Sequence, residues 1–520
     1  MNLYTLLSDI FAGLSPEEQA RTAIRCEGQS CTYRQLSAAI DSFADELLAR
    51  GIRPGEHVGL WSFNSLNWVA AFFAIVKVGA VAVLPNYSLP GDEVEAQFRR
   101  TDIVALLYGN SVALKRNPDA AGQLAQRLKL RELIDLRAPE NEFFTRCEHS
   151  PEHQIELFCR VSSDRPGRTA FLIFTTGTTS APKAVMLHQR GLLATAEDLA
   201  LRTEALTGDS ACIALPLFHV FGIQWLTTYL LQHKTVYLQD RIHPENIISE
   251  VERFHVPDLV TVGTIYFQLI SHPGFSRIRD IVRFCQTGGG RITPTQFALL
   301  EGSFTDAKLF NGLGMTEAHG GVTEPLATDS ADRRAASLGR LGSYLEGKLV
   351  GPDGKELPPG QIGELCIRGL TLMNGYYPPG EAADDLDEEG WFRTGDLGSF
   401  DAAGNLCLAG RTKDIIIRGG ENVAPLDVET AIIELGGVRD TKVFGVPHPV
   451  YGESVECCLI PEDPEGFSAD ALREALKSRL AGFKIPSHFF AFDFFPLMSN
   501  GKLDEPALKA LLLTRLQSET

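Results

Sequence analysis

The most apolar stretch of the chain, residues 68–84, limits the possible folds more than any other segment. Lys77 lies near its middle, and a lysine there would cost a membrane-spanning helix about 2.5–3.5 kcal/mol. Gly79 follows and interrupts a helix that begins before it. We therefore interpret the stretch as a buried helix over 68–76, a turn, and a strand over 80–84.

Strand and helix patterns alternate around this stretch. Apolar residues recur at helical spacing over 35–50 and stop before Gly51, and a short apolar strand follows over 57–62. Because strand, helix and strand come in succession, the first half of the chain predicts an α/β fold with two parallel-type sheets and packed helices. Over about 338–410, short runs separated by Gly- and Pro-rich turns predict a small β-barrel.

The pattern changes again near the end of the chain. A short helix is expected over 426–435, a strand and turn over 438–448, and an amphipathic helix with a serine cap over 468–481. These elements predict a small α+β C-terminal domain over 411–520, which follows a large N-terminal domain over 1–410.

Composition excludes several classes of function. The chain has 520 residues, and 48 basic against 66 acidic side chains give a formal net charge of −18. Nonspecific binding to nucleic acid or anionic lipid requires basic patches, so neither is expected. Ten cysteines without a Cys-x-x-Cys pair are typical of reduced thiols, and the N-terminus has no signal-peptide pattern. We expect a cytoplasmic protein without an integral membrane segment, either a monomer or a homodimer.

A loop rich in hydroxyl groups lies between two apolar strands within residues 172–187. Residues 175–180 are Thr-Thr-Gly-Thr-Thr-Ser, and Pro182 and Lys183 follow. Successive backbone N–H groups in such a loop form an anion-binding concavity, and a lysine adds a point charge for a phosphate. The Walker pattern is absent and no helix follows directly, so the loop predicts a phosphate site of another class.

This loop resembles the phosphate-binding loop of the adenylate-forming superfamily, which comprises acyl- and aryl-CoA synthetases, stand-alone adenylation domains and luciferases. The family form is close to T-S-G-T-T-G-x-P-K-G, and this chain departs from it at Ser180 and Ala184. Further matches recur in family order from about residue 30 to the end of the chain. The resemblance implies an acyl-CoA synthetase whose C-terminal domain is a mobile lid that rotates between two half-reactions.

Two segments resemble the adenine- and phosphate-binding motifs of the family. The glycine-rich turn over 285–293 would lie against the adenine and the acyl group. Residues 311–320 resemble the YGxTE motif, in which Thr316 would contact the α-phosphate and Glu317 would hold Mg²⁺. Leu313 stands where the family usually has the aromatic residue that stacks on adenine, so we expect weaker ATP binding.

The ribose-binding motif of the family resembles residues 391–398, in which Asp396 would accept hydrogen bonds from the 2′ and 3′ hydroxyls. Arg411 would make a second ribose contact. The resemblance implies these nucleotide-binding residues: Thr175, Thr176, Gly177, Thr178, Thr179, Lys183, Gly288, Gly289, Gly290, Asn311, Gly312, Leu313, Thr316, Asp396 and Arg411.

Residues 215–222 resemble the acyl-site segment of the family, with His219 beside the substrate carboxylate. Its imidazole would hydrogen-bond the carboxylate or gate the tunnel, although an isolated histidine on an apolar strand is more often a core residue. Amino-acid-activating relatives place an acidic residue in this segment, and its absence here argues against an amino-acid substrate. The expected acyl pocket comprises His219, Val220, Phe221, Gln224, Thr264 and His319, together with Gly288 and Gly289.

The C-terminal motifs supply the remaining expected site residues. By position Lys413 is the hinge residue, and Gly419 and Gly420 would border the pantetheine tunnel, where only a bare backbone leaves room. Lys502, by itself typical of a solvated tail, resembles the adenylation lysine that bridges the carboxylate and the α-phosphate. The resemblance implies these catalytic residues: Lys502, His219, Thr316 and Glu317.

Together the motifs imply ATP-dependent activation of a fatty or aryl carboxylic acid to an acyl-adenylate, with release of pyrophosphate. CoA then accepts the acyl group, giving acyl-CoA and AMP, so ATP, Mg²⁺ and CoA are the expected cofactors. A second hypothesis is a stand-alone adenylating enzyme that loads the phosphopantetheine thiol of an acyl carrier protein. A third hypothesis, motivated by Ser180, Ala184 and Leu313, is a non-catalytic nucleotide-binding relative.

Overall fold

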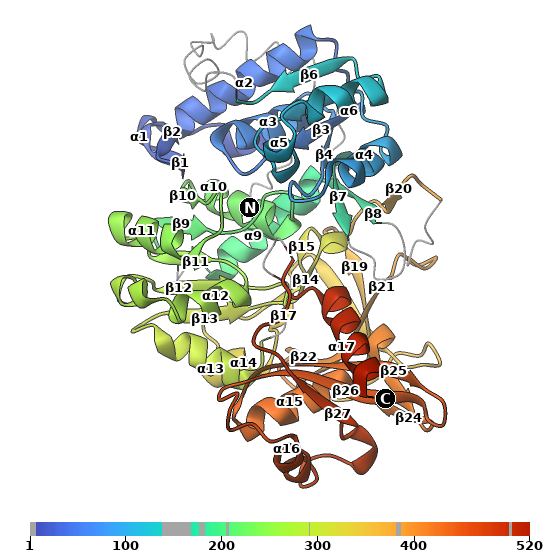
Figure 1. Cartoon of the computed structure of the whole chain (residues 1–520). Helices are drawn as coiled ribbons and strands as arrows, with labels where there is room; N and C mark the ends of the chain where they lie inside the picture. Colours follow the sequence, from blue (N-terminus) through green and yellow to red (C-terminus); the bar gives the residue numbers. More distant parts are fainter. Residues whose placement is uncertain are drawn as a thin grey trace.

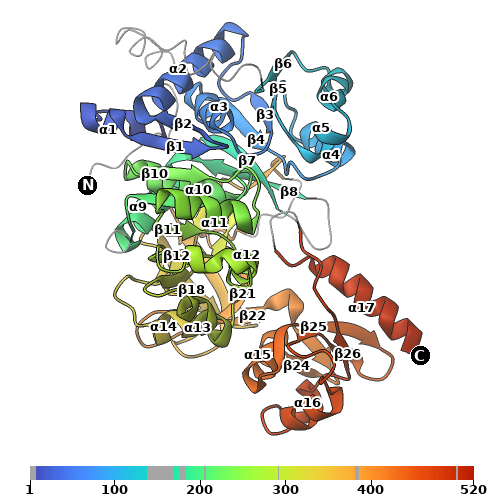
Figure 2. The same cartoon turned by 60° about the vertical axis from the view of Figure 1, so that its left-hand side comes forward.

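The structure is a computed structural model, and it describes residues 7–137, 168–175, 182–203, 207–290, 292–380, 386–498 and 502–519. Two large sheets with their helices form the upper and middle parts of the molecule in Figure 1, and a smaller sheet lies below them. The C-terminal elements form a separate group at the bottom, which stands apart from the sheets in the rotated view (Figure 2).

The first large sheet has seven strands in the order β13-β12-β11-β9-β10-β1-β2. Every neighbouring pair is parallel except β1 and β2, which form an antiparallel hairpin. Its strands are β1 (Thr22–Cys26), β2 (Gln29–Thr32), β9 (Ser210–Ile213), β10 (Thr235–Leu238), β11 (Asp258–Val260), β12 (Phe284–Thr287) and β13 (Lys308–Asn311).

The second large sheet also has seven strands, in the order β20-β8-β7-β4-β3-β5-β6. The pairs from β7 to β6 are parallel, whereas β7, β8 and β20 pair antiparallel. Its strands are β3 (His57–Trp61), β4 (Val81–Leu84), β5 (Ala105–Tyr108), β6 (Glu132–Asp135), β7 (Thr169–Thr175), β8 (Lys183–His188) and β20 (Tyr376–Tyr377). The predicted parallel-type sheets are therefore confirmed.

Helices cover both sheets. They are α1 (Pro16–Ala20), α2 (Tyr33–Ala49), α3 (Leu66–Lys77), α4 (Gly91–Arg100), α5 (Val112–Arg116), α6 (Ala120–Leu128), α9 (Gln189–Thr203), α10 (Val220–Leu231), α11 (Pro244–Phe254), α12 (Gly263–Ile270), α13 (Pro294–Ser303) and α14 (Ala331–Ala336). Three short 3₁₀ turns accompany them, η1 (Leu7–Phe11), η2 (Pro273–Arg277) and η3 (Thr316–Ala318).

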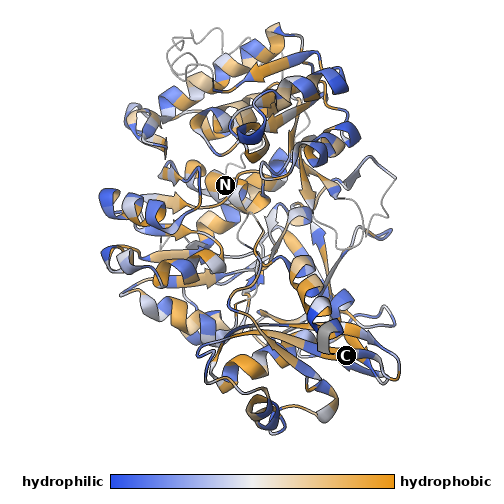
Figure 3. Cartoon of the chain, viewed as in Figure 1, coloured by the Kyte–Doolittle hydropathy of each residue, from blue (hydrophilic) through white to orange (hydrophobic). Residues whose placement is uncertain are grey.

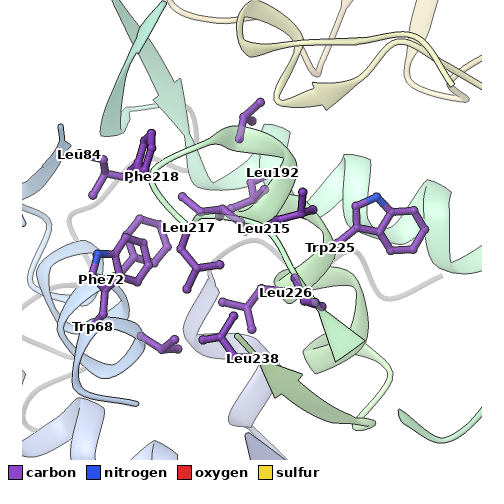
Figure 4. Packing of buried hydrophobic residues seen from close by; sticks show 14 of the residues in the cluster. Trp68, Phe72, Leu84, Leu192, Leu215, Leu217, Phe218, Trp225, Leu226 and Leu238 are labelled. Carbon is purple, nitrogen blue, oxygen red and sulfur yellow. The ribbon is translucent and has the colours of Figure 1, made fainter. Parts of the chain in front are cut away.

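The helix α3 shows why the most apolar stretch of the sequence is buried. Ser65 caps its first turn by accepting a hydrogen bond from Trp68 N, and the helix is buried from its first residue to Val76. The rings of Trp68 and Phe72 stack with centroids 5.5 Å apart, beside leucines of the segment that precedes α10 (Figure 4). Lys77 pairs with Asp41 of α2. Among the described helices, none combines the length and apolar character that crossing a bilayer requires.

A smaller antiparallel sheet occupies the region for which a β-barrel was predicted. It has four strands in the order β18-β19-β21-β22, so its edge strands β18 and β22 do not pair with each other. Its strands are β18 (Leu345–Val350), β19 (Gly363–Gly369), β21 (Phe392–Phe400) and β22 (Leu406–Arg411). Two short hairpin-like pairs adjoin it: β14 (Gly314–Met315) with β15 (Gly320–Gly321), and β16 (Thr323–Glu324) with β17 (Arg340–Leu341).

The C-terminal elements surround a sheet in the order β24-β23-β26-β25, with β27 paired to β26. They are η4 (Thr412–Asp414), β23 (Ile416–Arg418), β24 (Glu421–Val423), α15 (Pro425–Leu435), β25 (Val438–His448), β26 (Gly452–Pro461), α16 (Ala469–Leu476), η5 (Gly482–Lys484), β27 (His488–Ala491) and α17 (Glu505–Glu519). The helix predicted over 468–481 is thus shorter than expected, although Ser468 does cap it.

Separate hydrophobic cores support a division of the chain into two units. The large core extends as far as Leu406, and the cores of the C-terminal elements begin at Ile416. Apolar residues lie on the inner faces of the elements and polar residues on the outer faces in both parts (Figure 3). We propose that the boundary lies after residue 410, as the sequence predicts, and call residues 411–520 the C-terminal unit.

Candidate active site

A cavity of about 110 Å³ lies beyond the carboxyl ends of β12 and β13. Ligands of open α/β sheets bind in this position because the loops that follow parallel strands diverge there. The cavity is lined by Leu215, Pro216, His219, Val220, Phe221, Gln224, Trp225, Val262, Gln286, Thr287, Gly288, Gly289, Gly312, Leu313, Gly314, Met315, Thr316, Gly320, Gly321, Glu324 and Lys502.

Among the described residues of the C-terminal unit, Lys502 alone lines the cavity. Met498 N donates to Lys502 O at 2.7 Å, and Leu497 pairs with Leu503. A Cβ atom on Gly289 would lie 2.5 Å from Lys502 Cε, so the lysine reaches the cavity across a glycine backbone. Burial, and to a lesser degree the charge of Arg411, lowers the pKa of the Lys502 ammonium.

His219 lies beside this lysine, at the residue that precedes the first turn of α10. Burial, together with the positive charge of Lys502, lowers the pKa of the imidazole to about 3. The ring is therefore neutral at pH 7. This end of the cavity presents a lysine and a neutral imidazole to an anionic ligand.

Lys183 and Glu317 are brought together by a residue that sequence reasoning missed, Tyr376. Lys183 Nζ lies 4.3 Å from the centroid of the Tyr376 ring, and Tyr376 Oη donates to Glu317 Oε1 at 3.0 Å. Burial raises the pKa of the Glu317 carboxyl, and the charges of Lys183 and Arg411 oppose that shift. Tyr376 reaches this position because β20 pairs with β8, a contact for which the sequence carries no local signal.

Asp396 and Arg411 form an ion pair across neighbouring strands. They are Cα partners in the ladder of β21 and β22, and Arg411 Nε donates to Asp396 Oδ1 at 2.8 Å. The other carboxylate oxygen, Oδ2, is buried and has no hydrogen-bond partner in the described part of the chain. Burial raises the pKa of Asp396, and Arg411 opposes the shift. An unpaired buried carboxylate oxygen fits a ligand that donates a hydroxyl.

Several predicted residues line the cavity together, and others do not. His219, Val220, Phe221, Gln224, Gly288, Gly289, Gly312, Leu313, Thr316 and Lys502 line it. Gly290, Asn311, Thr264 and His319 do not. Gly290 is exposed and Asn311 is buried, and both are next to residues that line the cavity.

His319 requires a correction, because its ring is a packing element and not part of the pocket wall. Nε2 accepts a hydrogen bond from His188 N at 2.9 Å, and Nδ1 lies 2.8 Å from the carbonyl oxygen of Thr371. Burial lowers the pKa of this imidazole to about 3. Thr264, on α12, likewise does not line the cavity.

The remaining predicted residues lie away from the cavity or outside the described residues. Lys413 lies in η4, and Gly419 and Gly420 form the exposed turn between β23 and β24. Thr175, the last residue of β7, is paired with Lys183 of β8. The predicted strand–loop–strand is therefore confirmed at its two strands, whereas Thr176, Gly177, Thr178, Thr179 and Ser180 lie outside the described residues.

Three further polar residues line the cavity but were not assigned individually from the sequence: Gln286, Thr287 and Glu324. All three are buried, and Gln286 Nε2 donates to Glu324 Oε2 at 3.4 Å. Burial raises the pKa of Glu324 to about 8. Gln286 and Thr287 lie within the glycine-rich segment 285–293, which is a signal that could have identified them, but Glu324 lies beyond the YGxTE-like motif.

Comparisons with known proteins agree with this geometry. The family model described as AMP-binding enzyme matches residues 15–377, and the one described as AMP-binding enzyme C-terminal domain matches residues 427–502. A feruloyl-CoA synthase of Amycolatopsis sp is 31% identical over 490 residues, 93% of this chain and 94% of the relative. A 2-succinylbenzoate–CoA ligase of Bacillus subtilis is 30% identical over 502 residues, 96% of each chain.

Solved structures show the same fold. ATP-bound MatB from Rhodopseudomonas palustris superposes with a TM-score of 0.85 at 22% identity over 98% of each chain. The o-succinylbenzoate CoA synthetase MenE from Bacillus subtilis, in complex with its acyl-adenylate intermediate, gives a TM-score of 0.79 at 27% identity over 97% of each chain. From these matches and the cavity, the chain belongs to the AMP-binding, adenylate-forming enzyme family, in the branch of the acyl- and aryl-CoA synthetases.

Proposed function

We propose that this chain is an acid–thiol ligase that activates a carboxylic acid with ATP and transfers the acyl group to CoA. The carboxylate attacks the α-phosphorus of ATP and pyrophosphate leaves, and the CoA thiol then attacks the acyl-adenylate and AMP leaves. The observation that carries the proposal is the position of Lys502, which reaches from the C-terminal unit into the cavity beside Gly289 and His219.

The first half-reaction brings two anions together, so positioning and charge neutralisation are its main requirements. We propose that Lys502 stabilises the negative charge that develops between the carboxylate and the α-phosphate. We propose that neutral His219 forms a hydrogen bond with the carboxylate. Asp396 Oδ2 accepts from the ribose, since it is buried and has no other partner within the described residues. Thr316 contacts the α-phosphate, and Leu313 covers the adenine.

Lys183, Tyr376 and Glu317 form the group that we assign to the phosphates of ATP. Lys183 supplies a positive charge, and Glu317 supplies a carboxylate for a metal ion. Within the described residues, no three histidine, cysteine or acidic side chains gather into a metal site. A single carboxylate nevertheless fits Mg²⁺, which is usually held by one or two carboxylates and by substrate phosphates. We propose that Glu317 holds the ion, which supplies charge neutralisation, and that Tyr376 orients its carboxylate.

We propose an aryl or fatty acid as the substrate class. The feruloyl-CoA synthase and 2-succinylbenzoate–CoA ligase relatives carry aryl acids in their names, and leucine, valine, phenylalanine and tryptophan side chains form much of the cavity wall. CoA, rather than a carrier protein, is the proposed acceptor, because the similar relatives are named as CoA ligases. Cytoplasmic location and a monomeric or dimeric state remain predictions of the sequence.

Pyrophosphate release tests this function. The whole chain is incubated with ATP, Mg²⁺ and a panel of aryl and fatty acids, with and without CoA, and then with a phosphopantetheinylated carrier protein. We expect release with at least one acid and formation of its CoA thioester. Release without any thioester on CoA, but with loading of the carrier, would replace CoA by the carrier as acceptor. No release with any acid would contradict the proposed function.

A further inference from the structure

Two buried polar side chains, Gln286 and Glu324, lie side by side in the cavity wall. Gln286 is 1% exposed and Glu324 is 7% exposed, and both line the cavity. Gln286 Nε2 donates to Glu324 Oε2 at 3.4 Å and to Thr287 O at 3.1 Å. Their contact joins β12 to β16, which are 35 or more residues apart in the sequence, so the fold itself creates the pair.

Each of the two side chains has one oxygen atom without a hydrogen-bond partner in the described part of the chain. Gln286 Oε1 and Glu324 Oε1 are buried without a hydrogen-bond partner among the residues that the structure describes, as is the hydroxyl of the adjacent Thr287. A buried polar atom that stays unsatisfied costs roughly 1–3 kcal/mol. Native proteins rarely keep several such atoms together unless a ligand or solvent satisfies them. The three residues line the cavity, so a ligand that enters it can supply the missing partners.

The pair offers a donor and an acceptor together. Burial raises the pKa of Glu324 to about 8, against the opposing effects of Gln286 and Arg202, and Asp198 adds to the rise. The carboxyl is therefore largely protonated at pH 7. Because Oε2 accepts from Gln286, the proton belongs on Oε1, which then donates, while Gln286 Oε1 accepts. A group that both donates and accepts, such as a hydroxyl, complements the two atoms.

The pair lines a different part of the cavity wall from the lysine. Gln286 and Glu324 pack against each other, whereas Lys502 packs against Gly289. Glu324 is also packed against Gly312, where a Cβ atom would lie 2.3 Å from Oε2. A substrate whose carboxylate meets Lys502 would thus extend its other end toward Gln286 and Glu324.

We propose that Gln286 and Glu324 determine specificity by binding a hydroxyl group at the end of the substrate acid that is remote from its carboxylate. The inference rests on the proposed function and narrows its substrate class to hydroxylated acids. The hydroxyl donates to Gln286 Oε1 and accepts from the Glu324 carboxyl. An acid without the hydroxyl leaves both groups unpaired on binding, which is how sites built for a substrate hydroxyl reject the analogue that lacks it.

Matched acids test the proposal. Pyrophosphate release is measured for two pairs, each with and without the remote hydroxyl: phenylpropanoic acid and its para-hydroxy derivative, and a straight-chain acid and its omega-hydroxy derivative. In at least one pair we expect kcat/KM to be about 10- to 100-fold higher for the hydroxylated acid, mainly through KM. Equal use of both members of each pair by the unmodified chain would overturn the proposal without any variant.

Variants distinguish the contribution of the two side chains to substrate preference from that of the rest of the pocket. Glu324→Met and Gln286→Leu keep the side-chain volume but remove the polar atoms. The ratio of kcat/KM for the hydroxylated acid to kcat/KM for the plain acid should therefore fall toward one. Glu324→Gln is the matched control and should keep most of the preference, because an amide still donates and accepts. A preference that is unchanged in Glu324→Met overturns the assignment, as does a stronger preference for the omega-amino acid, which indicates an ionised Glu324 that binds a cation.

A binding measurement distinguishes failure of this inference from failure of the proposed function. Calorimetry compares sulfamoyl-adenosine analogues of the hydroxylated and plain acids, which mimic the acyl-adenylate and need no turnover. If no acid releases pyrophosphate, the proposed function fails, and a preference for the hydroxylated analogue that is lost in Glu324→Met still supports the hydroxyl site. Equal binding of the two analogues overturns the hydroxyl site whatever the activity.

Discussion

Two sites on the C-terminal unit differ sharply in their surroundings. Lys502 lines the cavity and lies against Gly289, whereas the turn of Gly419 and Gly420 is exposed. A Cβ atom on Gly420 would meet nothing within 4 Å. Both sites belong to the same small unit, so we expect its orientation to decide which of them can act.

We propose that the structure represents the conformation for adenylation. Lys502, proposed for the first half-reaction, lines the cavity, whereas the glycines proposed for the pantetheine tunnel do not line it. If both assignments hold, the C-terminal unit rotates between the half-reactions, as the family resemblance implies. Changes at the two sites should therefore impair different half-reactions, and the following variants are ordered by the size of the expected effect.

Lys502→Ala should have the largest effect. Removal of a positive donor from the developing charge is expected to slow pyrophosphate release about 100- to 1000-fold. Thioester formation from a supplied acyl-adenylate should stay close to normal, because the proposed rotation would withdraw the lysine in that step. Lys477→Ala is the control, since Lys477 pairs with Glu474 on the surface of α16. Equal losses in both half-reactions would contradict the proposal that Lys502 and Gly420 act in different half-reactions.

Gly420→Leu should show the opposite pattern. Thioester formation should fall at least about tenfold because a side chain would narrow the tunnel, while pyrophosphate release stays nearly unchanged. Gly420 has φ +88, so the matched control is Gly437→Leu, which places the same side chain at φ +76 in another open turn of the unit. If the control lost as much thioester formation as Gly420→Leu, backbone strain and not the tunnel would explain the result.

Gly289→Ala tests whether the contact between Gly289 and Lys502 matters for adenylation. The added Cβ would lie 2.5 Å from Lys502 Cε, at a residue with φ +74, so the lysine must shift. We expect pyrophosphate release to slow by roughly tenfold, equivalent to about 1.4 kcal/mol. Gly290→Ala is the control, since its Cβ would meet nothing within 4 Å. Identical rates for the two alanine variants would show that the contact with Lys502 is unimportant.

Leu313→Tyr should have the smallest effect, and a favourable one. Leu313 lines the cavity and is only partly buried, so a ring can extend over a bound adenine. Stacking on a base contributes about 1–3 kcal/mol, part of which leucine already supplies through apolar contact. We expect the KM for ATP to fall a few-fold in steady-state measurements with saturating acid. An unchanged or higher KM would count against an adenine contact at this residue.

Local patterns explain why much of the fold could be predicted. The helices α2, α3 and α15, and the antiparallel strands β7 and β8, coincide with apolar runs that lie within the segment itself, and Thr32 and Ser65 cap α2 and α3. Residues 438–448 were expected to end in a turn, but they form one strand. The whole segment pairs with β26, and this tertiary contact overrides the Gly and Pro signals.

Membership of a motif was the signal by which site residues could be predicted from the sequence. Lys183, Asp396, Arg411 and Lys502 are of this kind, although their roles remain proposals. Tyr376 and Glu324 could not be found in this way, because each acquires its position through strand pairing or burial with residues far away in the sequence. His319 lies within a motif and was assigned to the pocket, yet its ring nitrogens are engaged by backbone groups.

The ion pair of Asp396 and Arg411 has a mechanical consequence. Arg411 is the last residue of β22, and the next residues, η4, begin the connection to the C-terminal unit. If Asp396 binds the ribose as proposed, the same carboxylate also holds the residue from which the C-terminal unit would rotate. Nucleotide binding at Asp396 and rotation of the unit would then be coupled through the guanidinium of Arg411.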